Sequence, residues 1–244
     1  MRLGRSTLVR CFLRTYLMGA NFNSRGLQNI GLAYAMDPGL RDLYSDPEQL
    51  RQARSRFLSL YNSHPWWNPM LVGYFLFLES HIARGALSAQ SIERIKTTAT
   101  YTLSALGDSF FSGSLMVLWS LVAVALFFQG WLGAAVAWFI LPLCLLQVFK
   151  ATTFWLGWSK GLKVLQWLKE LNIMGWAERI KLLNALLIVL LWAILYPPGQ
   201  QPLLALSGGT LLAGSAYLVA RRRIPREAAL LALVGLLCLA WGFI

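Results

Sequence analysis

Residues 109–149 read SFFSGSLMVLWSLVAVALFFQGWLGAAVAWFILPLCLLQVF, a run of 41 residues without a charged side chain. A helix rises about 1.5 Å per residue, so the run would be roughly 60 Å long as a helix. The hydrocarbon core of a bilayer is about 30 Å thick, which is half that length. Gln129 and Gly130 lie near the middle of the run and predict a turn there. The run therefore predicts a helical membrane hairpin.

Two later stretches have the same character. Residues 182–220 are 39 residues without a charge, interrupted by the turn-forming segment 197–202, and residues 228–244 add 17 more. The sequence therefore predicts an all-α integral membrane protein with about five transmembrane helices. We expect the crossings at about 112–129, 131–149, 182–197, 203–220 and 228–244.

The overall composition excludes two classes of protein. Hydrophobic residues make up 57% of the 244 residues and charged residues 13%, against about 25% charged in an average soluble domain. This excludes a disordered chain and a water-soluble monomer. The 22 basic and 10 acidic residues give a net charge of +12. In so apolar a chain, this excess indicates anionic lipid or cytoplasmic loops rather than a nucleic-acid partner.

The distribution of charge divides the chain near residue 108. Residues 1–108 carry 12 basic and 7 acidic side chains, whereas residues 109–244 carry 10 and 3. We expect an amphipathic, partly buried or re-entrant helical region at 1–108 and a transmembrane region at 109–244. The basic connections 150–181 and 221–226 should face the cytoplasm. This predicts a multi-pass protein of the inner (plasma) membrane with most of its N-terminal region cytoplasmic.

Local signals place the helices of the first region. Asp37-Pro38 and Asp46-Pro47 each offer an N-cap followed by a proline at the first helical position, so a helix is expected to begin at each. Gln49 completes a capping-box spacing with Asp46. The apolar stripe of the second helix includes Leu60 and predicts that it continues until just before His64-Pro65.

Three more segments follow. The apolar run Met70–Leu78 is too short to cross a bilayer, and it predicts a buried helix or one arm of a re-entrant hairpin. A further helix should begin near Ser88 and end near Gly107. Leucines and lysines interleave in residues 154–171, where Leu162 belongs to the apolar set, and predict an interfacial amphipathic helix.

The sequence contains no recognisable catalytic constellation. Its two histidines, His64 and His81, lack neighbours at metal-ligand spacing, and no phosphate-binding or nucleophile motif is present. The three cysteines are dispersed and odd in number, so they indicate no disulfide framework. We therefore expect no catalytic residue, no metal site, no cofactor and no phosphorylated residue on this chain.

Polar residues beside breaks in apolar sequence are the candidate binding residues, because interrupted backbone at membrane depth lines protein or a water-filled cavity. They are Asn62, His64, Glu79 and Asp108. A solitary histidine is more often structural than functional. Asp108 has two alternative roles: it caps the span that follows, which local geometry favours two to one, or it accepts hydrogen bonds from a sugar hydroxyl.

Three segments, taken in order, resemble the D component of the mannose-type sugar phosphotransferase system. They are NSRGLQNIGLAYAMDPGLRDLY at 23–44, FLSLYNSHPWWNPMLVGYFLFLES at 57–80 and LSALGDSFFSGSL at 103–115. Their specific core is the ordered combination of Q-N-x-G-x-A-Y, N-x-H-P and G-D-S. The first, second and fourth of the candidate residues lie within the last two motifs.

The resemblance implies a permease subunit, not an independent enzyme. With a C component it would bind a hexose outside and release it inside as its phosphate, the phosphoryl group coming from a cytoplasmic, phosphorylated B component. The implied partners are the C component, the B component, a hexose and the lipid bilayer, in a hetero-oligomer. The alternative is a membrane scaffold or regulatory remnant that keeps the fold without moving sugar. The polar candidate residues favour transport, because a scaffold has no need of polar groups that are costly to bury.

Overall fold

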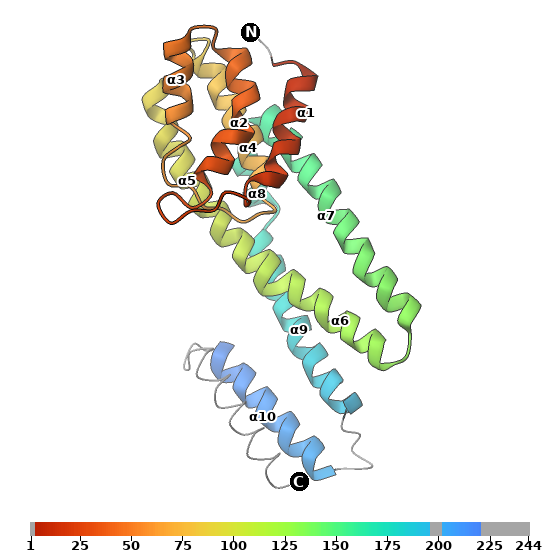
Figure 1. Cartoon of the computed structure of the whole chain (residues 1–244). Helices are drawn as coiled ribbons and strands as arrows, with labels where there is room; N and C mark the ends of the chain where they lie inside the picture. Colours follow the sequence, from red (N-terminus) through yellow and green to blue (C-terminus); the bar gives the residue numbers. More distant parts are fainter. Residues whose placement is uncertain (1–2, 196–201, 221–244) are drawn as a thin grey trace.

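A computed structural model describes residues 3–195 and 202–220, and they are almost entirely helical (Figure 1). Within this part of the chain, β-structure is limited to isolated bridges of Leu27 with Asn23 and with Tyr61. The all-α prediction is therefore confirmed. The helices are α1 (Arg5–Arg14), a short 3₁₀-helix (Thr15–Leu17), α2 (Asn29–Leu43), α3 (Pro47–Ser55), α4 (Asn68–Ile82), α5 (Ala89–Gly107), a π-helix (Asp108–Leu115), α6 (Met116–Phe128), α7 (Leu132–Lys160), α8 (Lys163–Glu170), α9 (Ile173–Leu195) and α10 (Pro202–Ala220).

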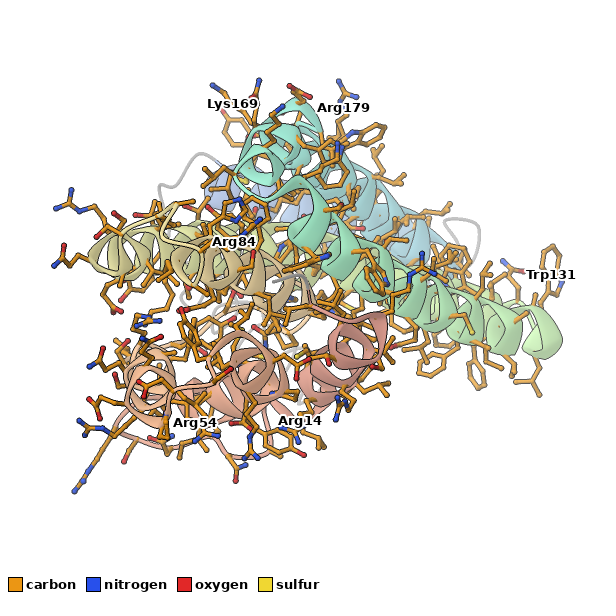
Figure 2. All side chains as sticks on the ribbon, turned by 90° about the horizontal axis from the view of Figure 1, so that it is seen from above. Arg14, Arg54, Arg84, Trp131, Lys169 and Arg179 are labelled. Atoms are coloured by element: carbon orange, nitrogen blue, oxygen red, sulfur yellow. The ribbon has the colours of Figure 1, made fainter. Side chains whose placement is uncertain are left out.

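Helices α1–α5 and α8 gather into a head at one end of the molecule, and α6, α7 and α9 extend away from it (Figure 1). Seen from above, Lys169 of α8 and Arg179 of α9 lie together at one edge of the molecule, whereas Trp131 lies at the far tip of the α6–α7 hairpin (Figure 2). The charged side chains and the apolar hairpin are thus separated along the molecule.

The predicted membrane hairpin is present as two long helices. Helix α5, the π-helix and α6 form one uninterrupted helix, Ala89–Phe128, and both it and α7 are long and apolar enough to cross a membrane. They are joined by a turn in which Gly130 has φ +76°. The N-terminal region that we place at 1–108 therefore ends inside a continuous helix. Helix α5 ends at Gly107, as predicted, but the backbone continues directly into the π-helix.

The charged ends of three apolar segments lie at one level. Lys181, the last charge before the apolar part of α9, donates to Ser109 Oγ at 3.1 Å. The rings of Phe111 and Phe149, which neighbour the charge boundaries on the other two helices, are 5.4 Å apart. These contacts bring the charged ends of the three apolar segments to one level, which we call the boundary plane.

Helix α4, which contains the apolar run 70–78, is the centre of the head. Twelve of its 15 residues are buried, so a 15-residue helix of this composition serves as a core element. It packs most extensively against α7. The run thus forms a buried helix, as one of the two predicted alternatives has it.

The predicted helix start at Asp37-Pro38 is wrong, because Pro38 lies inside α2. A proline within a helix leaves the carbonyl of the residue four positions earlier without its backbone donor. Here that carbonyl, Tyr34 O, accepts a hydrogen bond from Arg14 Nη1 at 3.0 Å. Asp37 forms ion pairs with Arg41 and Arg54 instead of capping a helix.

The start of α3 is confirmed and its predicted end is wrong. The Asp46 carboxylate accepts from Gln49 N at 2.8 Å, which is the expected N-cap. The helix ends at Ser55 rather than near His64, and Leu60, which belongs to the predicted apolar stripe, is exposed. The start of the next helix is also confirmed, since the Ser88 side chain caps α5.

The amphipathic segment 154–171 is divided between two helices. Its first part belongs to α7, and only Lys163–Glu170 forms a separate helix, α8. Leu168 is buried as expected, whereas Leu162 is exposed. The predicted crossings at 182–197 and 203–220 fall largely on α9 and α10. The turn at 197–201, the basic loop 221–226 and the crossing 228–244 lie outside the described residues.

Candidate functional site

The π-helix Asp108–Leu115 is a polar junction between the head and the apolar helices. Its Ser112 Oγ lies 3.1 Å from His64 Nε2, and its Ser114 carbonyl accepts from Asn184 Nδ2 of α9 at 2.9 Å. Together with the Lys181–Ser109 bond, these contacts connect the π-helix to the loop before α4 and to α9. Short π-helical stretches inside α-helices occur often at functional sites, so the junction is a candidate for the site itself.

His64 is held in a defined orientation against this junction and is only 7% exposed. Its ring stacks on Phe111 with centroids 5.2 Å apart, and its Nδ1 faces the backbone N–H of Trp66 at 3.4 Å. An Nδ1 that accepts from Trp66 leaves the proton on Nε2, which then donates to Ser112 Oγ. Burial lowers the pKa of His64, and the nearby Asp108 charge opposes this shift. The imidazole is therefore neutral near pH 7.

Gly107 allows this close approach. A Cβ at position 107 would collide with the Cβ and Cγ of His64. In the G-D-S motif, Gly107 therefore leaves space for the histidine of N-x-H-P. The charge of Asp108 raises the pKa of that histidine. The two most specific motifs predicted from sequence meet at this point.

Asp108 is exposed and has helical dihedral angles, φ −61° and ψ −42°. It stands within a continuous helix, so it cannot be an N-cap, which requires a non-helical residue before the first turn. The favoured local role for Asp108 is therefore wrong. Its carboxylate remains available for other partners.

Asn62 is exposed and lines a pocket of about 280 Å³ between α5 and the loops that precede α2 and α4. The hydroxyl of Thr100, which also lines the pocket, is buried without a hydrogen-bond partner among the described residues. The lining is rich in hydroxyl, amide and carboxylate groups, as recognition of a neutral polyol requires. The lining residues are Leu27, Ser59, Leu60, Asn62, Glu93, Thr97, Thr100, Tyr101 and Ser104.

One face of α5 connects the pocket with Asp108. Thr97, Tyr101 and Ser104 line the pocket, and together with Asp108 they follow the spacing i, i+4, i+7, i+11 of a single helix face. Asn62, His64 and Asp108 are thus brought to one region around the C-terminal half of α5.

Glu79 is not part of this region. It is completely buried in α4, where Arg56 donates to both of its carboxylate oxygens at 2.9 and 2.7 Å, and Tyr44 Oη donates at 2.7 Å. Burial, and then the Glu79 charge, raise the pKa of Tyr44. Arg56 and Tyr44 supply the hydrogen bonds to the Glu79 carboxylate. Glu79 therefore stabilises the core of the head.

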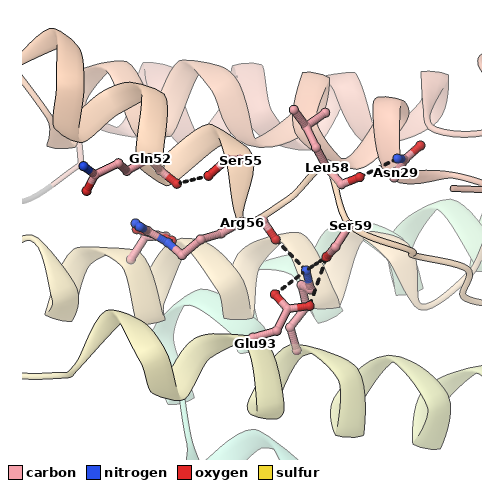
Figure 3. Close-up of polar contacts among 9 residues, drawn as sticks. Asn29, Gln52, Ser55, Arg56, Leu58, Ser59 and Glu93 are labelled. Carbon is pink, nitrogen blue, oxygen red and sulfur yellow. Dashed lines mark hydrogen bonds and ion pairs between the residues drawn. The ribbon is translucent and has the colours of Figure 1, made fainter.

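Lys96 is a residue that the sequence analysis missed. It is 1% exposed, and its ammonium contacts Arg56 O, Ser59 Oγ and Glu93, which ties the loop at the rim of the pocket to α5 (Figure 3). A signal was present: Lys96 falls on the apolar stripe of α5, four residues after the buried Ile92. A lysine on a buried stripe must find partners.

A second, larger hollow between α6 and α7 has a volume of about 740 Å³ and is lined only by apolar side chains such as Phe127 and Phe139. It offers nothing that orients a sugar. In the described part of the chain, no group of three or more His, Cys, Asp or Glu residues could hold a metal ion.

Comparison with known proteins gives a consistent family. A profile of the PTS system mannose/fructose/sorbose family IID component matches residues 2–195. The chain is 23% identical over 184 residues to the fructose permease IID component of Bacillus subtilis and 28% identical over 170 residues to the mannose-specific EIID component of Escherichia coli K12. These matches cover 75% and 68% of this chain, and 67% and 59% of the two relatives.

The fold is also shared with a solved structure. A chain of the complex of the mannose transporter ManYZ with microcin E492 superposes with a TM-score of 0.61 at 21% identity, covering 99% of this chain and 96% of that one. At this identity the likeness concerns the fold, a helical membrane-protein architecture.

Proposed function

The chain belongs to the IID components of the mannose/fructose/sorbose family of the sugar phosphotransferase system, and on that premise we propose that it binds and translocates a hexose together with a C component. Membership makes it a membrane subunit of a sugar phosphotransferase system. In this proposal, the cytoplasmic B component, phosphorylated in turn, transfers its phosphoryl group directly to the sugar.

The pocket beside α5 is the observation that carries the proposal. A hexose is neutral and rich in hydroxyls, so its site must provide several hydrogen bonds, since each polar group left unpaired costs about 1 to 3 kcal/mol. The pocket offers Asn62, Glu93 and the unpartnered hydroxyl of Thr100. In this proposal, a C component completes the site.

We assign different roles to the four residues predicted from sequence. Asn62 and Asp108 contact the sugar, since both are exposed on the side of α5 that carries the pocket. His64 is a positioning residue that acts through Ser112 on the π-helix. Glu79 stabilises the head through Arg56.

The proposed orientation places the head and the boundary plane of Asp108, Lys150 and Lys181 at the cytoplasmic face. In this arrangement the basic residues at the ends of the apolar segments lie inside, as lysine and arginine do in loops of membrane proteins. Gly130, in the turn between α6 and α7, is then outside. A cysteine at position 130 should react with an impermeant thiol reagent added to intact cells, and one at position 169 should not.

The test of function uses the protein purified together with its C component. Hexose binding should be saturable, and Asn62→Ala should weaken it by about tenfold, roughly 1.4 kcal/mol. Asn21→Ala is the matched control, because Asn21 is also exposed but does not line the pocket. A pair that assembles normally but binds no hexose, and that passes no phosphoryl group from the B component to sugar, would support the scaffold alternative.

A further inference from the structure

Lys150 is a half-buried lysine between two aromatic rings. Its ammonium lies 4.3 Å from the centroid of the Tyr16 ring and 4.7 Å from that of Trp66. Among the residues that the structure describes, the Lys150 ammonium takes part in no hydrogen bond within 3.5 Å and no ion pair within 4.0 Å. Cation–π contacts attract the ammonium but leave its charge unneutralised. The side chain is therefore a cation without a counter-charge among the described residues.

The position of Lys150 along α7 corresponds to the depth of the lipid headgroups. It is the first charge after the apolar residues 132–149 of α7, a length of about 27 Å at 1.5 Å per residue, close to the thickness of a hydrocarbon core. The contacts of Lys181 with Ser109 put the charged ends of neighbouring helices at the same height. Tyrosine and tryptophan gather at this depth, where the lipid headgroups lie.

Exposed apolar side chains lie on the face of α7 below Lys150. Leu143 and Phe139 lie seven and eleven residues earlier on the same helix face, and both side chains are exposed. They lie about 10 and 16 Å deeper in the bilayer. The same helix face thus offers a cation at headgroup depth and, beyond the buried Leu146, exposed apolar side chains at acyl-chain depth.

We propose that Lys150, Tyr16 and Trp66 form a binding site for the phosphate of an anionic phospholipid, with an acyl chain lying along Leu143 and Phe139. The ammonium pairs with the phosphate, and the two rings frame it. The Tyr16 ring is fixed for this role because its hydroxyl donates to Gln147 Oε1 at 2.8 Å. The site is independent of the hexose proposal, since it uses none of the pocket residues.

Native mass spectrometry of the full-length protein, released from detergent with phosphatidylglycerol or phosphatidylcholine, tests the proposal. Wild-type protein should retain phosphatidylglycerol preferentially. Lys150→Met should weaken that binding about fivefold, and Lys150→Arg should retain it. Lys169→Met is the matched control, because Lys169 is an exposed lysine of α8 (Figure 2) and should leave binding unchanged.

Two results would overturn the site. One is an equal preference for phosphatidylglycerol in wild type and Lys150→Met. The other is displacement of the lipid by millimolar inorganic phosphate, which would identify a soluble anion as the ligand. If Lys150→Met does not fold, Tyr16→Leu tests the same site, because Tyr16 is exposed and its loss removes one of the two framing rings. Unchanged lipid binding in a folded Tyr16→Leu protein would also contradict the proposal.

Discussion

Gly73 of α4 and Gly157 of α7 lie against each other's helix backbone. A Cβ at Gly73 would collide with the carbonyl oxygen of Phe154, and a Cβ at Gly157 would collide with that of Met70. Backbone atoms cannot move aside as the end of a flexible side chain can. The two glycines therefore set how closely the core helix of the head approaches the helix that continues into the membrane hairpin.

Gly157→Ala should destabilise the protein. Overpacking at a tight contact costs about 1 to 3 kcal/mol, which exceeds the gain of up to about 1 kcal/mol in helix propensity. Gly133→Ala is the matched control on the same helix, because a Cβ there meets nothing within 4 Å. Thermal unfolding in detergent measures the difference. Equal melting temperatures for the two variants would contradict the close-packing argument.

The buried pair of Glu79 and Arg56 gives the second prediction. Glu79→Gln leaves a guanidinium, 17% exposed, without its counter-charge, and removing one partner of a buried pair costs about 3 to 5 kcal/mol. The variant should unfold at a lower temperature, while its folded fraction binds hexose normally. Glu48→Gln is the control, because its pair with Arg51 is exposed. Weaker hexose binding at unchanged stability would indicate that Glu79 contacts the sugar.

The two long apolar helices of the α6–α7 hairpin could be predicted from the sequence, because the lack of charge and the length of a segment report directly on the membrane. The course of α2 could not. Pro38 is acceptable inside a helix only because Arg14, from a different helix, supplies the donor that the proline removes. Such a rescue depends on tertiary structure, and the local pattern Asp37-Pro38 contains no sign of it.

The site was predictable in part for a similar reason. The motifs identified His64 and Asp108, yet Ser112 becomes a partner of His64 only because the π-helix turns it toward the loop. For Glu79 the sequence showed an acid beside an apolar run, and the structure supplies Arg56, 23 residues away, as the reason for its burial. The sequence identifies polar residues beside breaks in apolar segments as candidates, but the contacts that they make depend on partners far away in the chain.

The α6–α7 hairpin is fastened by two reciprocal bonds. Trp119 Nε1 donates to Trp138 O, and Trp138 Nε1 donates to Trp119 O, both at 3.0 Å. Replacing either tryptophan by phenylalanine should cost about 0.6 kcal/mol and at most about 1.7, the range for side-chain bonds in membrane proteins. Each acceptor is a backbone carbonyl that survives the substitution, so the two losses should add in the double variant if the two bonds form independently, although neighbouring residues are often coupled.

This additivity is measured by unfolding in denaturing detergent. Trp131→Phe is the control, because Trp131 is exposed at the tip of the hairpin (Figure 2). A double variant no less stable than either single one would show that the two bonds form and break as a unit.

His64 should make stability depend on pH. Burial lowers its pKa in the folded state below the ordinary value of about 6.5. Between that value and the lowered one, the unfolded state binds more protons, so the free energy of unfolding falls as the pH drops below about 6.5. His64→Gln should have a flatter profile between pH 8 and pH 5.5 than wild type. A variant that loses as much stability as wild type on acidification would contradict this assignment.

The last prediction concerns whether the Asp108 carboxylate contacts the sugar. It cannot act as an N-cap, since it lies within a continuous helix. Asp108→Asn keeps its size and, as an exposed surface change, should alter stability by no more than about 0.5 kcal/mol. If the carboxylate accepts bonds from the sugar, hexose binding should weaken about tenfold or more, which is about 1.4 kcal/mol.

Asp46→Asn is the matched control, because Asp46 is an exposed aspartate that caps α3 and asparagine caps about as well. Binding is measured with the purified pair, and Asp108→Ala is added because alanine offers no oxygen to a hydroxyl. If affinity is normal in both Asp108 variants, the carboxylate does not touch the sugar. Asn62 would then bind the sugar without a contribution from Asp108. The C-terminal end of the α5 face would lie outside the sugar site.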